Sequence, residues 1–497
     1  MKVILLAAGR SKRLKPIEDK NFLKFLGKPL LLHQLEQLSV FFDDFIVIGG
    51  AHNLEKIREL LNGWKANKTG GKAKSGKSKL KSTGPKFQFV EQKNLDEGMA
   101  GALLSAESLI GKEPILVVSA NDVVESQAYK LMLEAIKSVD GANGQAKSAA
   151  KKSQKKLVLL AKGVGTSGQL ESFLIGKKVE SYFPGGYLKT AKDGSIQGIV
   201  EKPGAGNEPS DMINLVIHYH KNSEALLKAL HSVNSTKDDR YEVAMDHLIK
   251  AGHKMKSVPY NGFWQSIKYP WHVLSLMEYF LRTIEGNGER KARGKNKPFI
   301  LEGKNVEIAK TAIIKGPVFL DDGVKVFENA VISGPAYIGK NSIVATNALV
   351  RGSMTGENCI IGFSTEVARS YLGDMVWTHS NYIGDSVIGN NVSFGAGTVT
   401  GNLRLDEGNI KVNITDVRID SGRNKFGLIT GNNVRCGINT SFMPGVKIGN
   451  NSMIGAGIIV AEDIPDNKLV YGKTELVIKN YTAKIDEKKR AEMKGKL

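Results

Sequence analysis

Two groups of residues, far apart in the chain, have the types and the spacing to do chemistry. The first follows the apolar run 2–8, where a loop beginning at Gly9 carries Arg13 and leads to Lys20. Backbone N–H groups of a glycine-containing loop at the start of a helix suit the phosphate groups of a ligand. Asp122 ends a second apolar run. Both features therefore lie at the carboxyl ends of expected strands, where parallel α/β sheets bind ligands.

The second group surrounds His379, in a stretch from 377 to 404 that is rich in Gly, Asn and Thr. Histidine has an unperturbed pKa near ~6.5, so it can act as a general base at neutral pH. A single histidine in a loop is more often structural than catalytic. The role of His379 therefore depends on the residues that accompany it.

The first 281 residues alternate between expected strands and helices. An amphipathic helix opens at 25–30 and ends at Leu38. Apolar runs with the length of buried strands lie at 2–8, 45–50, 86–90 and 115–122. This alternation indicates a Rossmann-like α/β domain with a parallel sheet.

The stretch from Ile308 to Val350 repeats every six residues. Its aliphatic positions are Ile308, Ile314, Leu320, Val326, Ile332, Ile338, Val344 and Val350. A helix has a period of 3.6 and a strand a period of 2, so neither explains this repeat. Short strands joined by tight turns do, because each strand places one aliphatic side chain inside the coil. The sequence therefore predicts a parallel β-helix. Ile-Gly and Asn-Asn steps beyond residue 383 suit further turns.

The composition is that of a soluble protein with more than one domain, since the chain has 497 residues, of which 41% are hydrophobic. No apolar run approaches the ~20 residues of a membrane span. Two cysteines cannot form a disulfide framework, so we expect a cytoplasmic protein with no membrane partner. Most of the net charge of +20 lies in lysine-rich segments that are poor in apolar residues. These segments favour solvated insertions over a nucleic-acid site.

These features divide the chain into parts. We expect an α/β domain over 1–281, basic low-complexity insertions at about 62–86 and 140–156, a linker over 282–298, a β-helix over 299–480 and a charged tail over 481–497.

The first domain resembles the sugar-1-phosphate nucleotidylyltransferases. Its opening, Leu6-Ala7-Ala8-Gly9 followed by Arg13, Lys20 and Gly27-Lys-Pro29, is similar to the signature of that family. Later segments resemble its base-binding loop, its metal site and its sugar-binding elements, in this order: Gln92 with Gly98-Met99-Ala-Gly-Ala102, then Asn121-Asp122, then Gly186-Tyr187, Glu201-Lys-Pro203 and Asn214.

The resemblance implies that a sugar 1-phosphate attacks the α-phosphorus of UTP or dTTP and releases pyrophosphate. Such transfers need positioning and charge neutralisation more than a protein nucleophile. By resemblance, Arg13 binds the triphosphate, Lys20 neutralises charge on the α-phosphoryl group and Asp122 holds Mg²⁺. Nucleotide contacts are implied for Leu6, Ala7, Ala8, Gly9, Gln92, Gly98 and Met99, and sugar contacts for Gly186, Glu201 and Asn214.

Three positions depart from the family pattern. Gln92 lies one residue too far from Gly98, and Met99 stands where threonine is common. Ser266 takes the place of an aspartate that is a second metal ligand in many relatives. A neutral oxygen binds Mg²⁺ more weakly than a carboxylate does. Slowed or altered nucleotidyl transfer is therefore one expectation.

The stretch around His379 resembles the acetyl-transfer site of the bifunctional N-acetylglucosamine-1-phosphate uridyltransferases, in particular the archaeal type. The resemblance implies a left-handed β-helix with three hexads per turn. It also implies a homotrimer that forms the acetyl site between subunits. An amino sugar 1-phosphate is mostly in its ammonium form at pH 7, and His379 would take a proton from it before nitrogen attacks acetyl-CoA.

Further roles are implied around this histidine. Tyr382 and Asn402 would orient the sugar phosphate, Lys411 would contact substrate, and backbone groups at Ala396 and Ala456 would contact acetyl-CoA. Arg351 and Arg369 are candidates for binding the sugar phosphate.

The two resemblances together predict a bifunctional enzyme of nucleotide-sugar synthesis that needs Mg²⁺ and uses acetyl-CoA as co-substrate. Two alternatives stay open. In the first, the chain is a nucleotidylyltransferase whose β-helix serves only for trimerisation or regulation. In the second, it is a regulatory subunit that binds a sugar nucleotide and has neither activity.

Overall fold

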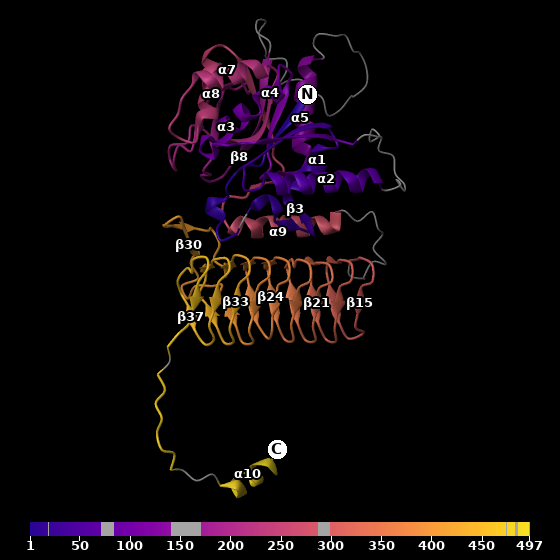
Figure 1. Ribbon diagram of the computed structural model, residues 1–497, viewed down its shortest axis with the longest axis vertical. Helices are drawn as coiled ribbons and strands as arrows, with labels where there is room; N and C mark the ends of the chain where they lie inside the picture. Colours follow the sequence, from indigo (N-terminus) through magenta and orange to yellow (C-terminus); the bar gives the residue numbers. More distant parts are fainter. Residues whose placement is uncertain are drawn as a thin grey trace.

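The computed structural model describes residues 1–17, 19–70, 84–140, 170–286, 299–473, 475–482 and 486–496. An α/β domain lies along one side of a β-helix, and helix α9 (Trp271–Gly286) runs between the two (Figure 1). Most of the two expected insertions, and the expected linker after residue 286, lie outside the described residues. Residues 62–70 and 282–286, predicted as insertion and linker, instead continue helices α2 (Leu54–Gly70) and α9.

The α/β domain is built on a mixed sheet, so the expectation of a parallel sheet is right only for its centre. The strands of this domain are β1 (Lys2–Leu6), β2 (Lys24–Phe25), β3 (Lys28–Pro29), β4 (Asp44–Gly49), β5 (Lys86–Glu91), β6 (Ile115–Ser119), β7 (Asp122–Val124), β8 (Leu170–Lys178), β9 (Gly186–Thr190), β10 (Ile196–Glu201), β11 (Met212–His220), β12 (Lys254–Pro259) and β13 (Trp264–Ser266). The order β6-β1-β4-β5 is parallel, as expected. Beyond β6 lies β11, which pairs antiparallel with it and connects to β8 and β9.

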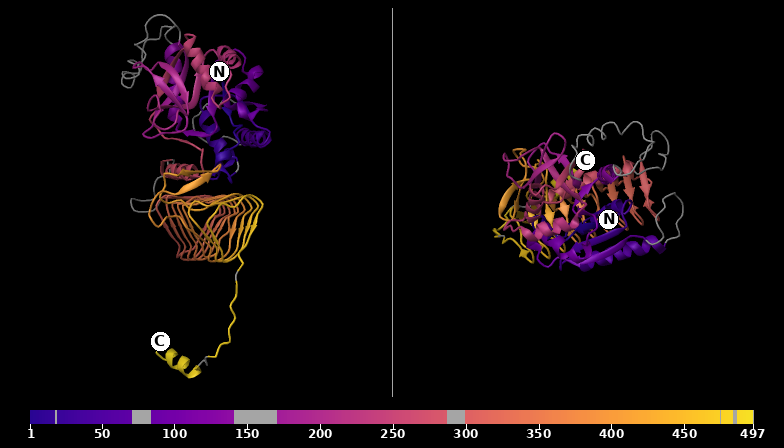
Figure 2. Two further views of the ribbon diagram at one scale, coloured as in Figure 1. Left: turned by 90° about the vertical axis from the view of Figure 1, so that its left-hand side faces the viewer. Right: turned by 90° about the horizontal axis from the view of Figure 1, so that it is seen from above.

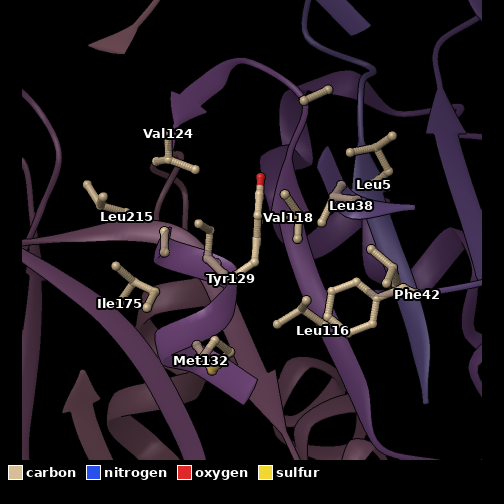
Figure 3. Packing of buried hydrophobic residues seen from close by; sticks show 14 of the residues in the cluster. Leu5, Leu38, Phe42, Leu116, Val118, Val124, Tyr129, Met132, Ile175 and Leu215 are labelled. Atoms are coloured by element: carbon tan, nitrogen blue, oxygen red, sulfur yellow. The ribbon is translucent and has the colours of Figure 1, made fainter. Parts of the chain in front are cut away.

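Helices pack on this sheet and bury its aliphatic side chains. Besides α2 and α9, they are α1 (Leu30–Leu38), α3 (Gly98–Ser105), α4 (Glu107–Ile110), α5 (Ser126–Asp140), α7 (Ser223–Ser232) and α8 (Arg240–Lys250). Leu5 and Val118 of the central strands are buried against Tyr129 of α5 and Leu38 of α1 (Figure 3). Each aliphatic side chain buried in this way stabilises the fold by roughly 1.5–3 kcal/mol. The core thus holds the carboxyl ends of β1 and β6 in fixed positions.

A buried polar cluster connects β11 to α8. The hydroxyl oxygen of Tyr241 lies 3.0 Å from Nδ1 of His218 and 2.9 Å from Nε2 of His220. The Oγ of Ser172 lies 2.9 Å from Nδ1 of His220. Desolvation lowers the pKa of His218 to about 3 and that of His220 to about 4. Both imidazoles are therefore neutral in the folded protein at pH 7.

We expect acid to destabilise the α/β domain before its carboxylates titrate. The unfolded chain takes up protons on both histidines below pH ~6.5, whereas the folded chain does not until the pH nears the lowered values. Stability is therefore complete above pH ~6.5 and decreases as the pH falls, by about 1.4 kcal/mol per pH unit for each histidine. Urea unfolding between pH 7 and 5 measures this slope. A free energy of unfolding that stays constant over that range contradicts the prediction.

The C-terminal domain confirms the six-residue repeat as a parallel β-helix. Its strands form three parallel sheets, which are the faces of a prism (Figure 2). The predicted inward positions from Leu320 to Val350 are buried, whereas Ile308 in the first coil is 37% exposed because no coil precedes it. Asn391 and Asn451 have φ angles of 54° and 55° in the turns, as the Asn-Asn steps suggested.

Each face consists of strands stacked in register. The first face contains β14 (Ile300–Glu302), β17 (Val318–Leu320), β20 (Ala336–Ile338), β25 (Tyr371–Leu372), β27 (Val387–Ile388), β32 (Ile429–Thr430) and β35 (Lys447–Ile448). The second face contains β15 (Glu307–Ile308), β18 (Lys325–Val326), β21 (Ile343–Val344), β23 (Ile360–Ile361), β28 (Ser393–Phe394), β33 (Arg435–Cys436), β36 (Met453–Ile454) and β38 (Leu469–Val470). The third face contains β16 (Ile313–Lys315), β19 (Val331–Ser333), β22 (Leu349–Arg351), β24 (Glu366–Ala368), β26 (Tyr382–Gly384), β29 (Val399–Thr400), β34 (Ser441–Phe442) and β37 (Ile459–Val460).

The first face of the β-helix packs against the α/β domain. Phe25 lies at the centre of the contact, with its ring centroid 5.0 Å from that of Phe280 in α9 and 5.6 Å from that of Tyr371 in the β-helix. Nζ of Lys24 lies 2.8 Å from a carboxylate oxygen of Asp374. The two domains therefore share an apolar cluster with an ion pair beside it, which fixes their relative orientation.

Two further segments leave the β-helix. An antiparallel hairpin, β30 (Lys411–Ile414) and β31 (Val417–Asp420), projects from it toward the α/β domain (Figure 1). The last strand, β38, ends at Val470, before the boundary predicted at 480, and an exposed tail with helix α10 (Glu487–Lys494) follows. Within the described ranges, no helix combines the length and the apolar character of a membrane span.

Candidate active sites

The predicted phosphate-binding loop leaves the carboxyl end of β1 in the middle of the sheet. Two buried asparagines fix its start, because Nδ2 of Asn21 and Nδ2 of Asn53 donate to the carbonyl of Ala7 at 3.0 and 2.9 Å. The chain then forms short 3-10 turns, Lys12–Leu14 and Lys20–Phe22, and not the start of an α-helix that the sequence suggested. Neither asparagine was predicted from the sequence to contribute to this loop.

Arg13, Lys20 and Asp122 come together at the carboxyl ends of β1 and β6. Nζ of Lys20 donates to the carbonyl of Ile267 at 3.2 Å, and the guanidinium of Arg13 lies 5.6 Å from the ring centroid of Tyr269. Desolvation lowers the pKa of Lys20 to about 8, an effect that Asp122 opposes and Arg13 reinforces. The three predicted groups therefore lie within electrostatic reach of one another. Such a cluster suits a highly charged substrate.

The surroundings of Asp122 fit one magnesium ion. Ser266 lies directly opposite Asp122 in the β7–β13 pair, so the neighbouring strand offers a hydroxyl and no carboxylate. Oδ1 of Asn121 is buried with no hydrogen-bond partner among the described residues. Mg²⁺ is commonly held by one or two carboxylates, with substrate phosphates and water as its other ligands. In the described parts of the chain, no group of three or more His, Cys, Asp or Glu side chains could hold a metal ion.

The predicted base-binding loop opens helix α3. Nε2 of Gln92 donates to the carbonyl of Gly98 at 2.8 Å, so the Gln92 amide shapes the loop from within. Gly98 has a φ of 55°, which favours glycine. Met99 is half-buried against the core. An ion pair between Arg10 and Asp96 joins this loop to the phosphate loop.

The predicted sugar-binding residues meet across neighbouring strands. Gly186 of β9 pairs with Glu201 of β10, and Asn214 lies on β11. A Cβ atom on Gly186 would lie 2.8 Å from Oδ1 of Asn214 and 3.0 Å from Oε2 of Glu201, so only glycine leaves both side chains in place. Nδ2 of Asn214 is buried with no hydrogen-bond partner among the described residues, and is therefore a free donor for a hydroxyl ligand.

Lys268 lies beside these groups, although the sequence analysis gave it no role. Its ammonium lies 4.0 Å from the ring centroid of Phe183 and donates to the carbonyl of Pro184. Desolvation lowers the pKa of Lys268 to about 7, and the charge of Asp122 is the strongest influence in the opposite direction. The signal in the sequence was a basic residue two positions after Ser266.

His379 lies exposed in a turn between the second and third faces of the β-helix. Its backbone N–H donates to Oδ1 of Asn381 at 2.5 Å. Nδ2 of Asn381 donates in turn to the carbonyls of Gly395 at 2.8 Å and Thr398 at 3.1 Å, in the next coil. Asn381 therefore fixes the turn that carries the imidazole. No role was predicted for Asn381 from the sequence.

Tyr382 and Asn402 contact one another, as their predicted shared role requires. Nδ2 of Asn402 donates to the hydroxyl of Tyr382 at 3.1 Å and to Oδ2 of Asp385 at 2.5 Å. Arg369 donates to both oxygens of Asp385 at 2.6 Å, and these hydrogen bonds raise the pKa of Arg369. Because Asp385 neutralises Arg369, that arginine is a positioning group for Asn402 and a weaker candidate for binding the sugar phosphate.

The remaining predicted residues surround this network. Ala396 and Ala456 lie exposed in one column of turns, next to the turn of His379. Lys411 is exposed at the start of β30. Arg351 pairs with Glu366 at 2.7 Å, so it too is neutralised. His379 and the two alanines thus lie at the edge between the second and third faces, whereas Asn402 follows the third-face strand β29 at the opposite edge of that face, where it contacts the hydroxyl of Tyr382.

The space around the Tyr382–Asn402 pair requires glycine at position 384. A Cβ atom there would lie 2.6 Å from the hydroxyl of Tyr382 and 2.7 Å from Nδ2 of Asn402. We expect Gly384→Ala to displace both groups and to lower acetyl transfer about tenfold, which corresponds to one or two lost hydrogen bonds. Coenzyme A release measures the effect. Gly63→Ala is the control, because a Cβ on Gly63 meets no atom within 4 Å. Equal rates in the two variants would exclude a role for this packing.

Known proteins resemble this chain in both of its domains. Residues 3–178 match the family model of the MobA-like NTP transferase domain. The chain is 30% identical to the bifunctional protein GlmU of Methanocaldococcus jannaschii over 486 residues, which cover 96% of this chain and 99% of the relative.

Two further relatives match over almost their whole length. The bifunctional protein GlmU of Methanococcus maripaludis strain C7 is 33% identical over 485 residues, 96% of this chain and 99% of that protein. A bifunctional sugar-1-phosphate nucleotidylyltransferase/acetyltransferase of Sulfurisphaera tokodaii is 30% identical over 472 residues, 93% of this chain and 98% of the relative. The resemblance found in the sequence is therefore confirmed, and the chain belongs to the family of bifunctional GlmU proteins.

Proposed function

We propose that the chain catalyses two consecutive steps of nucleotide-sugar synthesis. The β-helix transfers an acetyl group from acetyl-CoA to an amino sugar 1-phosphate, and the α/β domain transfers a nucleotidyl group from UTP or dTTP to the sugar 1-phosphate. The observation that carries this proposal is the presence, in one chain, of the Arg13–Lys20–Asp122 cluster, of an accessible His379 in the turn before β26, and of the Tyr382–Asn402 contact on the same face of the β-helix.

In nucleotidyl transfer, a phosphate oxygen of the sugar 1-phosphate attacks the α-phosphorus in line. A new P–O bond forms while the bond to the bridging oxygen breaks, and pyrophosphate leaves with that electron pair. Arg13 binds the triphosphate, and Lys20 lies where charge accumulates on the α-phosphoryl oxygens. Asp122 would hold a magnesium ion, which supplies further neutralisation of the phosphate charge. Glu201 and Asn214 orient the sugar through its hydroxyl groups.

In acetyl transfer, the nitrogen of the amino sugar attacks the thioester carbonyl of acetyl-CoA. His379 accepts a proton from the nitrogen as the C–N bond forms. The C–S bond then breaks, and the departing thiolate takes the proton from His379. Backbone N–H groups of the turns near Ala396 are suited to stabilising the tetrahedral oxyanion. Tyr382 and Asn402 orient the sugar phosphate.

A second copy of the chain completes the acetyl site in this proposal. His379, Ala396 and Lys411 are exposed in the single chain, so one subunit does not enclose a substrate. The outer surfaces of the second and third faces also expose large apolar side chains, among them Trp377, Met453 and Ile459. Exposed apolar patches of this kind mark association surfaces. We therefore expect light scattering to give three times the chain mass of 54.0 kDa, and a monomeric mass would contradict the shared site.

The test is an assay of the purified protein with defined substrates. Glucosamine 1-phosphate and acetyl-CoA are expected to release coenzyme A. N-acetylglucosamine 1-phosphate with UTP or dTTP and Mg²⁺ is expected to release pyrophosphate. Release of neither product from any pairing would leave the chain as a binding protein and would overturn the proposal.

A further inference from the structure

The site of nucleotidyl transfer has one carboxylate where two neighbouring strands could have supplied a pair. Residues directly opposite in an antiparallel pair present their side chains on the same side of the sheet, about 4.5–5.5 Å apart. The residue opposite Asp122 is Ser266, whose hydroxyl carries no charge. The protein therefore offers one carboxylate, that of Asp122, to hold metal ions near the phosphate groups of its substrates.

A lysine lies close to this gap. Lys268 follows Ser266 by two residues, and its side chain is half-buried. Its Nζ would lie 3.8 Å from a Cβ atom built on Gly185, so the ammonium stands beside the turn that leads into the sugar-binding strand β9. The ring of Phe183 and the carbonyl of Pro184 hold it there.

Lys268 lies within electrostatic reach of both groups of site residues. Asp122 and Arg13 influence it from the triphosphate side, and Glu201 influences it from the sugar side. A sugar 1-phosphate that spans these two sides must carry its phosphate between them. An ammonium at that point is a suitable partner for a dianionic phosphate.

We propose that Lys268 binds the phosphate of the sugar 1-phosphate and orients its attacking oxygen toward the α-phosphorus. This inference rests on the proposed function. It assigns the acceptor phosphate to a side chain of the protein, while Asp122 is left to hold the magnesium ion of the triphosphate.

A purely structural role is the alternative, since Lys268 also joins the 183–185 turn to the segment after β13. Lys177 offers a matched control for that role. Its Nζ donates to the carbonyl of Gly262 at 2.8 Å and lies 5.7 Å from the ring centroid of Tyr260. It thus makes the same two kinds of contact, but the charge that influences it is Glu125, not Asp122.

The experiment compares Lys268→Gln, Lys268→Arg and Lys177→Gln with the wild-type protein. We expect Lys268→Gln to raise KM for N-acetylglucosamine 1-phosphate at least tenfold, as the loss of a charged hydrogen bond does. KM for the nucleoside triphosphate should change less than about threefold. Lys268→Arg should recover part of the loss, and Lys177→Gln should behave as the wild type.

Binding without turnover gives a second readout. Calorimetry in EDTA with UDP-N-acetylglucosamine, or with its dTDP counterpart if dTTP is the substrate, should show weaker binding by Lys268→Gln and not by Lys177→Gln. If Lys268→Gln raised KM for the sugar 1-phosphate and for the nucleoside triphosphate equally, the assignment of the sugar phosphate to Lys268 would be overturned. Equal binding by Lys268→Gln and Lys177→Gln would overturn it as well. Wild-type protein that releases no pyrophosphate would count against the proposed function, and the binding comparison would still decide whether Lys268 contacts the sugar phosphate.

Discussion

Replacement of Lys20 by methionine lowers the rate of nucleotidyl transfer by about 10²–10³-fold, the usual effect of removing one charged group from a site that stabilises a transition state. Lys20 lies beside Asp122 and Arg13, and its ammonium is the cation expected to neutralise charge on the α-phosphoryl group. Methionine keeps most of the length of the side chain and removes the ammonium together with its hydrogen bond to the carbonyl of Ile267. Pyrophosphate release at saturating substrate measures the loss.

The control for this variant is Lys2→Met. Lys2 is also half-buried and also donates to a backbone carbonyl, that of Leu109 at 2.7 Å, but it stands at the opposite end of β1. We expect Lys2→Met to keep nearly full activity. Acetyl transfer should stay unchanged in both variants, because the β-helix makes none of these contacts. A Lys20→Met protein that is as active as Lys2→Met would remove Lys20 from the catalytic site.

Replacement of His379 by alanine has the second large effect. We expect acetyl transfer to fall by about 10²–10⁴-fold, the range found when a general base is removed. Asn381 holds the turn through its contact with the backbone of residue 379, so the coil should remain in place without the imidazole. Coenzyme A release measures the rate, and nucleotidyl transfer should be unaffected.

His231→Ala is the control, because His231 is another exposed histidine and pairs with Glu107 in the α/β domain. If the wild type transfers acetyl groups and His379→Ala does so at the same rate, another group must accept the proton. Absence of acetyl transfer from the wild type, together with normal pyrophosphate release, would favour the alternative in which the β-helix serves only for association.

The β-helix could be predicted from sequence because its period is unlike that of other structures. Each hexad places one aliphatic residue inside, and the buried positions from Leu320 to Val350 follow this rule. The strands β1, β4 and β6 were also predictable, since each is a largely continuous apolar run buried on both faces, whereas β5 alternates apolar with exposed polar residues. The regular elements were thus determined by local patterns.

Features that depend on contacts between distant segments could not be predicted. The antiparallel pairing of β11 with β6 cannot be read from the spacing of apolar residues in either strand. Phe25 and Tyr371 form the interface between the domains, yet each looks like an ordinary core residue in its own segment. The role of Asn53 at the phosphate loop likewise depends on its distance from Ala7 in space, which no spacing in the chain encodes.

The candidate sites were predictable to the extent that motifs carry them. Arg13, Lys20 and Asp122 were identified from their order in the sequence, and the structure brings them together. The pairing of Arg369 with Asp385 was not foreseeable, because those residues lie in adjacent coils. Lys268 was missed because it fills no position of the family motif, and only the fold places it beside Asp122 and Glu201.

If one chain performs both chemistries in sequence, the acetyl group of acetyl-CoA must reach the nucleotide sugar, and isotope tracing follows it there. Purified protein is incubated with glucosamine 1-phosphate, acetyl-CoA labelled in its acetyl group, UTP or dTTP, and Mg²⁺, and the products are identified by mass spectrometry. We expect a nucleotide sugar that carries the labelled acetyl group, formed together with coenzyme A and pyrophosphate. A labelled sugar 1-phosphate that never gains a nucleotide, or a nucleotide sugar that never gains the label, would contradict this expectation.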